Sequence, residues 1–195
     1  MTIRSQISAL KGLLCAAALL LTACAQTPGA PLVNNVDVGP SYSPALLRYT
    51  AAQGGIPVSF PNLPFLEPRE TAVPLLLQSM RTARIGDQIP LLAEAPPGVN
   101  PGLRIVVLLD AAASTEAGDL CRGGELTAGS AGERMRVYMA ACRGRQPVSR
   151  SRGSLLPPAR PDDAALGELL RTMLLVTLPP DNPNRGRDGR RKWKP

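Results

Sequence analysis

Arginine side chains are concentrated in one stretch of the sequence, and their spacing favours anion binding. Residues 134–152 contain no acid and hold Arg134, Arg136, Arg143, Arg145, Arg150 and Arg152. Because residues two apart share a strand face, a hairpin here would place Arg134 and Arg136 beside Arg150 and Arg152. Gathered guanidinium groups suit phosphate or carboxylate ligands. These four arginines are candidate anion-binding residues; the alternative is a solvated strand face balanced by acids elsewhere.

The side chains that carry out most hydrolytic chemistry are absent or poorly placed. The sequence has no histidine, which excludes Ser-His-Asp and Cys-His nucleophiles and removes the commonest zinc ligand. Four acids surround Cys121, but carboxylates in an Ala- and Gly-rich loop are usually solvated: Asp110, Glu116, Asp119 and Glu125. We expect no catalytic residue, no metal and no cofactor. A histidine-free enzyme would need a close cluster of acids in a deep pocket.

The first residues have the organisation of a secretion signal. Arg4 and Lys11 supply positive charge without an acid, and an apolar run of small side chains follows over residues 13–23. A charged region before a short apolar region is typical of a signal peptide. The run is about half of the roughly 20 apolar residues that a membrane-spanning helix needs. We therefore expect residues 1–23 to be a cleaved signal peptide.

The end of this signal carries a motif of its own. Leu21-Thr22-Ala23-Cys24 resembles the lipobox of bacterial lipoproteins. The resemblance implies cleavage before Cys24, acylation of Cys24 with palmitate-type chains and, since Ala25 follows, release to the outer membrane. Two or more acyl chains make membrane binding effectively permanent. The alternative is an ordinary secretory signal whose cleavage site precedes a cysteine by chance.

The remaining cysteines follow from that resemblance. If Cys15 leaves with the signal and Cys24 is lipidated, Cys121 and Cys142 are the two thiols left in an oxidising compartment. Two such thiols usually form a disulfide bond. We expect this bridge to stabilise the fold by about 3 kcal/mol.

The net charge of +7 is unevenly distributed. Much of the excess lies in residues 181–195, which end Arg-Arg-Lys-Trp-Lys-Pro. We expect a disordered basic tail here; the alternative is a segment that lies on an anionic membrane surface. Nucleic acid is not an expected partner, because the compartment is wrong and one tryptophan and two phenylalanines offer little stacking surface.

After the expected signal peptide, residues 24–102 predict short helices and strands. Residues 24–40 are rich in proline, glycine and asparagine, as in a flexible tether. Ser43 and Pro44 favour the start of a short helix over 45–53. Residues 56–60 predict an edge strand because they include Pro57. Apolar residues at helical spacing predict a helix over 71–84, followed by a long connection with a short strand near 89–92.

The second half predicts a hairpin and a final helix. Residues 103–109 are apolar on both faces, as a central strand would be. Residues 134–142 alternate, which predicts a strand with one wet face, and 148–152 predict a polar edge strand beyond a turn at Gly144. Asp162 or Asp163 can cap a helix that ends before Pro179-Pro180.

These elements predict an α+β fold. The order favours a two-layer sandwich: a mostly antiparallel sheet of about four strands with two amphipathic helices on one face. The expected boundaries are 1–23 signal peptide, 24–40 flexible tether, 41–180 single α+β domain and 181–195 disordered basic tail.

The function expected from these features is binding rather than catalysis. We predict a lipid-anchored outer-membrane lipoprotein at the periplasmic face, acting as a binding or scaffolding module of the cell envelope with a protein partner. Its plan is similar to small assembly lipoproteins such as the partner of the lipopolysaccharide translocon, an analogy of architecture only. The alternative is a binder of anionic glycolipid or cell-wall polymer through the arginine hairpin.

Overall fold

The computed structural model describes residues 30–185, except 82–84, 86–87, 99, 101, 125, 127–128 and 130–131. The expected signal peptide, the lipidation site Cys24 and the basic end of the tail, residues 186–195, lie outside the described residues. Among the helices that are described, none is long and apolar enough to cross a bilayer.

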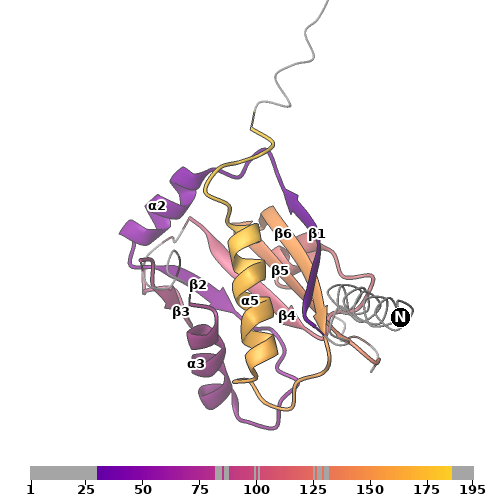
Figure 1. Cartoon of the computed structure of the whole chain (residues 1–195). Coiled ribbons are helices and arrows are strands. Elements are labelled where there is room, and N and C mark those ends of the chain that lie inside the picture. The colour runs from indigo at the N-terminus through magenta and orange to yellow at the C-terminus, as the bar shows by residue number, and fades with distance from the viewer. Residues whose placement is uncertain are drawn as a thin grey trace, which may run out of the picture. The chain divides into compact units, whose positions relative to one another are not determined.

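A six-stranded sheet forms the centre of the described domain, in the order β1-β6-β5-β4-β2-β3. Strands β1, β6, β5 and β4 pair antiparallel, whereas β4, β2 and β3 pair parallel (Figure 1). The strands are β1 (Leu32–Val38), β2 (Ile56–Ser59), β3 (Leu91–Leu92), β4 (Arg104–Leu109), β5 (Met135–Arg143) and β6 (Gln146–Leu155). The α+β class is confirmed; the sheet is mixed and larger than the four antiparallel strands expected.

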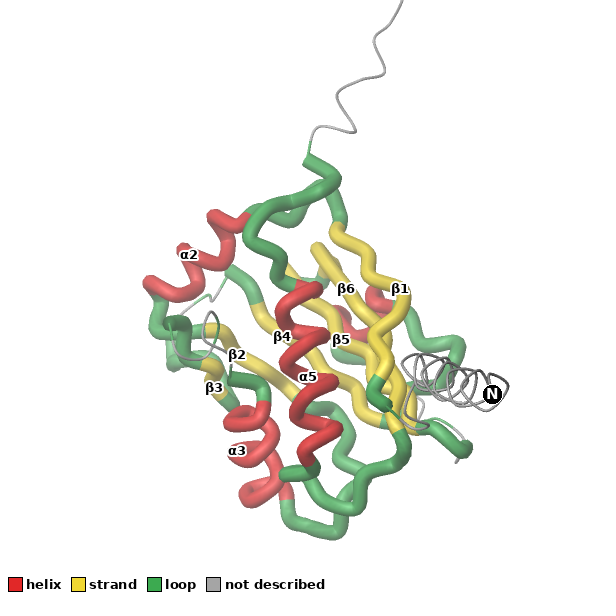
Figure 2. Tube along the Cα trace, in the orientation of Figure 1, coloured by secondary structure: helices red, strands yellow, loops and turns green. Residues whose placement is uncertain are grey.

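Helices α2, α3 and α5 pack on one face of this sheet (Figure 2). Their bounds are Pro44–Ala52, Arg69–Ser79 and Ala164–Thr177. The caps follow the sequence: the Ser43 hydroxyl accepts from the backbone N–H of Ala45, and the Asp163 carboxylate accepts from those of Ala165 and Leu166. Alternate strand residues such as Val107 and Met139 meet the apolar stripe of α5, forming the main core.

A fourth helix covers part of the opposite face. Helix α4 (Ala117–Arg122) buries Leu120 and Cys121 against the strand residues that point away from α5. These are Val106, Leu108, Tyr138, Ala140 and Cys142. The face of β5 expected to be exposed to solvent is therefore largely buried, since residues 111–122 fold back over it. A six-residue helix in an Ala- and Gly-rich segment has too few turns to show a periodic pattern.

Strand β1 lies inside the 24–40 range that the sequence analysis assigns to a tether. One extra residue interrupts its pairing with β6 between Asn34 and Asp37, and Asn35 has a φ of 49°. This β-bulge breaks the period of two that identifies a strand. Because β1 pairs with the outer edge of β6, β6 is an interior strand and not the edge strand expected for residues 148–152.

Strand β2 is also an interior strand, between β4 and the two-residue β3. Pro57 precedes Val58 and Ser59, the residues that pair with β4, so its missing N–H interrupts no bond of that ladder. Proline is thus compatible with this interior position.

The first residues of the expected tail are packed into the domain. The Asn182 amide donates to the backbone oxygens of Gly39 (3.0 Å) and Tyr42 (2.8 Å), and the Tyr42 hydroxyl donates to Pro179 (2.7 Å). The ordered domain therefore starts before residue 41 and continues past residue 180.

These bonds predict the effect of a substitution. Asn182→Ala is expected to lower the free energy of unfolding by about 1–3 kcal/mol, because it leaves partly buried carbonyls without their donor. Asp181→Ala, at an exposed neighbouring position, should change it by no more than about 0.5 kcal/mol. Urea unfolding followed by circular dichroism compares the two; equal midpoints would mean that residues 181–185 do not support the fold.

Candidate anion-binding pocket

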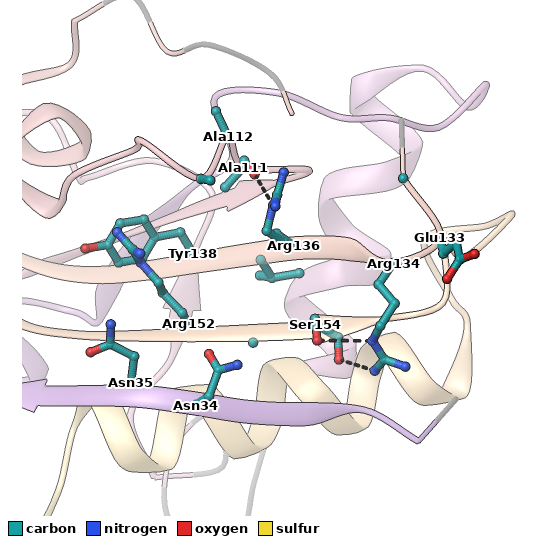
Figure 3. Close-up of a pocket in the computed structure, with 14 residues that line it drawn as sticks. Asn34, Asn35, Ala111, Ala112, Glu133, Arg134, Arg136, Tyr138, Arg152 and Ser154 are labelled. Atoms are coloured by element: carbon teal, nitrogen blue, oxygen red, sulfur yellow. Dashed lines mark hydrogen bonds between the residues drawn. The ribbon is translucent and has the colours of Figure 1, made fainter. Parts of the chain in front are cut away.

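A pocket of about 770 Å³ lies on the α4 side of the sheet, across β1, β6 and β5. Figure 3 shows its residues: Asn34 and Asn35 come from β1, Arg152 and Ser154 from β6, and Arg136 and Tyr138 from β5. The start of the connection after β4, at Ala111 and Ala112, closes the far side (Figure 3). The strand register positions these groups, since Arg136 faces Ser154 and Tyr138 faces Arg152.

Arg136 is held by a backbone oxygen at the edge of the pocket. Its Nε donates to the carbonyl of Ala111 at 3.2 Å, and the N–H of Ala111 donates to the carbonyl of Arg136 at 2.8 Å. A guanidinium has five N–H donors, and this bond uses the one on Nε. The two terminal nitrogens of Arg136 form no hydrogen bond with another described residue, so they can donate to a ligand.

Arg152 is fixed by two contacts. Its Nη2 donates to the carbonyl of Thr115 at 2.7 Å, and its guanidinium carbon lies 4.6 Å from the centroid of the Tyr138 ring. The ring and the carbonyl both attract the cation without neutralising it. Among the described residues neither Arg136 nor Arg152 has a carboxylate within salt-bridge distance.

Arg134 closes the other end of the pocket. It donates to the Ser154 hydroxyl at 3.2 Å and to the Ser154 carbonyl at 3.0 Å. Glu133 lies beside it at the rim and is the one acid among the described lining residues (Figure 3). The three guanidinium groups outweigh that carboxylate, so the described part of the lining carries net positive charge.

Arg150 does not line the pocket. It pairs with Asp37 of β1 at 2.8 Å, at an exposed site near the other end of the strands. Partial burial lowers the pKa of Arg150, but the phenol of Tyr138 and the carboxylate of Asp37 outweigh it and raise the pKa above its ordinary value. Arg150 is therefore a cation paired with Asp37.

The Tyr138 hydroxyl is the most unusual polar group of the site. Tyr138 is 2% exposed, and its hydroxyl forms no hydrogen bond of normal geometry with any described residue. Arg150 lies close enough to the phenol to interact with it both electrostatically and as a hydrogen-bond donor, and both interactions raise the pKa of Arg150. The hydroxyl oxygen is itself inaccessible, so Tyr138 contributes to the site through its ring, which lies against Arg152, and not through a ligand contact of the hydroxyl.

The structure thus brings together three of the four candidate arginines, Arg134, Arg136 and Arg152, and places Arg150 apart. Asn34 and Asn35 were not predicted, because the bulge interrupts the alternation by which β1 could be identified. The carbonyls of Ala111 and Thr115 were not predicted either, since every residue has a backbone carbonyl whatever its type. Tyr138 shares its face of β5 with Arg136, and its burial depends on α4, which the sequence does not predict.

The expected disulfide is present and lies beside the site. Cys121 of α4 and Cys142 of β5 are bonded, with a Cα–Cα distance of 5.5 Å, and both are fully buried. The bond ties α4 to the sheet, and the segment leading into α4 supplies the carbonyls that hold Arg136 and Arg152.

The described acids near Cys121 are not gathered into one site. Asp119 pairs with Arg122 at 2.6 Å on the exposed side of α4, and Glu125 lies outside the described residues. Within the described ranges no three side chains of the His, Cys, Asp and Glu types are gathered as metal ligands would be. The chemistry available in the pocket is hydrogen bonding and charge recognition of an anion.

Solved structures that resemble this chain include two PelC assemblies. A PelC dodecamer from Paraburkholderia phytofirmans with a single substitution is 13% identical, with coverage of 76% of this chain and 97% of that chain and a TM-score of 0.38. A second PelC dodecamer from this organism is 12% identical, with coverage of 77% and 96% and a TM-score of 0.34. No family model and no curated protein matches the chain.

Proposed function

We propose that this chain is a non-enzymatic lipoprotein of the outer membrane that binds an anionic component of the cell envelope from the periplasmic face. The lipobox-like segment ending at Cys24 supports the anchor. The absence of histidine from the sequence supports binding rather than catalysis. The ligand occupies the pocket formed by β1, β6 and β5.

One observation carries the binding role: guanidinium groups are held in place by backbone carbonyls rather than by carboxylates. Arg136 and Arg152 keep their full charge and already have their orientation, through Ala111 and Thr115 respectively. A ligand then gains charge-assisted hydrogen bonds without the loss of side-chain freedom that flexible arginines would suffer on binding. A merely solvated strand face would need no such bracing.

Pyrophosphate binding tests this role. We expect the full chain, purified in a non-ionic detergent, to bind inorganic pyrophosphate, and R136Q/R152Q to bind it about 100-fold less tightly or more weakly still. Each charged hydrogen bond contributes about 1.5–3 kcal/mol, and tenfold corresponds to about 1.4 kcal/mol. Calorimetric titration at moderate salt measures the affinity.

The matched control is R143Q/R145Q, which removes the same charge from the exposed turn of the same hairpin. It should leave the affinity within about twofold, since exposed charges beyond a Debye length of about 10 Å are screened. Equal losses in both double variants, with unchanged melting temperatures, would show that the pocket has no special role.

A further inference from the structure

The pocket lies on the strand with which the chain enters the domain. Strand β1 begins at Leu32 and contributes Asn34 and Asn35 to the pocket. A fully extended chain spans at most about 3.3–3.6 Å per residue, so Asn34 lies no more than about 36 Å from Cys24. Because the β1 pairing starts so early, only a short stretch after Cys24 can act as a tether. A lipid on Cys24 would therefore hold the pocket next to the membrane surface.

The same end of the sheet exposes apolar side chains. The first residue of β1, Leu32, pairs with Ser154 near the end of β6 and is 50% exposed. Leu156, just after β6, is 54% exposed. Arg134, just before β5, is at the same end of the sheet and donates to the Ser154 carbonyl. Exposed leucines next to arginines, where the chain would leave for its anchor, are the composition of a surface that lies against a charged bilayer.

The donors in the pocket favour phosphate over carboxylate. Besides the guanidinium groups, the lining offers the side-chain amides of Asn34 and Asn35 and the hydroxyl of Ser154. A carboxylate accepts through two oxygens, and a bidentate arginine alone can occupy both. A phosphate group has more acceptor oxygens and can bind several donors that approach from different strands.

We propose that the anion bound in this pocket is the phosphate of an anionic phospholipid headgroup, in the leaflet that holds the Cys24 lipid. This assignment rests on the proposed function and names its ligand. The short tether raises the effective headgroup concentration at the pocket to the millimolar range, so a weak site suffices. The bound headgroup holds the domain in one orientation, in which β1 and the end of β6 lie against the membrane.

Hydrogen exchange of the lipidated chain in vesicles tests the assignment. The vesicles are phosphatidylcholine alone, phosphatidylcholine with phosphatidylglycerol, or phosphatidylcholine alone with inorganic pyrophosphate in solution. We expect slower amide exchange in β1 and in residues 111–115 when phosphatidylglycerol is present. The slowing should be about tenfold where the effective headgroup concentration is ten times Kd.

Two variants separate pocket binding from general attraction to the anionic surface. R136Q/R152Q should lose the protection, and R143Q/R145Q should keep it. A flexible insertion of about 30 residues between Gly29 and Ala30 should weaken it, since effective concentration falls steeply with linker length.

The outcomes distinguish the two proposals. Protection by pyrophosphate but not by phosphatidylglycerol overturns the headgroup assignment and leaves the anion pocket standing. Protection by neither overturns both. Equal loss in the two arginine variants also overturns the assignment, because it shows attraction to the surface without use of the pocket.

Discussion

Removal of the disulfide bond by C121A/C142A is expected to lower the free energy of unfolding by about 3 kcal/mol. The bonded cysteines are 21 residues apart, and a closed loop of that length loses about this much entropy from the unfolded chain. Loss of two buried sulfur atoms from the small core under α4 adds to the effect. Denaturant unfolding of the variant and of the oxidised wild type measures the difference.

The same change should also weaken the anion pocket. Helix α4 makes its apolar contacts through Ala117, Leu120 and Cys121, which is little surface for a segment to pack on without a covalent link. When it loosens, the carbonyls of Ala111 and Thr115 hold Arg136 and Arg152 less firmly. We expect pyrophosphate affinity to fall about tenfold, the size of effect found when residues that orient metal ligands are removed.

Reduction of the wild-type protein is the control for this prediction. Dithiothreitol should reproduce the lower stability of the variant and should have no effect on the variant itself. A reduced wild type that unfolds at the same denaturant concentration as the oxidised protein would contradict the assigned role of the bond.

The parts of the fold that sequence analysis located share one property, a regular pattern over several residues. Helix α5 repeats its apolar residues until Pro179, and β4 is apolar throughout, so both were located within a few residues of their ends. Strand β1 and helix α4 were missed because a bulge interrupts one and the other is too short to repeat. The mixed sheet order follows from those omissions, since β1 decides which strand lies at the edge.

The candidate site divides in a similar way. The arginines could be found because charge without neighbouring acids is visible in residue types. Their positions relative to one another could not be found in this way, because they depend on the strand register. The Gly144-Arg145 turn and the bulges set that register, which places Arg136 opposite Ser154 and Arg150 beside Asp37. Tertiary contacts, above all the folding of residues 111–116 over β5, decide which guanidinium groups line a pocket.

Gly153→Ala is expected to destabilise the domain by about 1–3 kcal/mol, the usual range for an overpacked core position. Gly153 lies on β6 between the pocket residues Arg152 and Ser154. A side chain at position 153 would point toward α5. A Cβ atom there would lie 2.8 Å from Leu169 Cδ1, 3.0 Å from the Met173 sulfur and 3.0 Å from the carbonyl oxygen of Leu32. The side chains of α5 can move in part; the backbone oxygen of β1 cannot move without shifting the strand.

That last contact links packing to binding. If β1 shifts away from β6, Asn34 and Asn35 move relative to Arg152, so Gly153→Ala should also lower pyrophosphate affinity although it changes no ligand-facing side chain. Gly124→Ala is the matched control, since a Cβ at Gly124 meets nothing within 4 Å; it should change stability by no more than about 0.5 kcal/mol. Equal unfolding midpoints for the two alanine variants would mean that α5 does not pack against β6 at Gly153 as closely as these distances require.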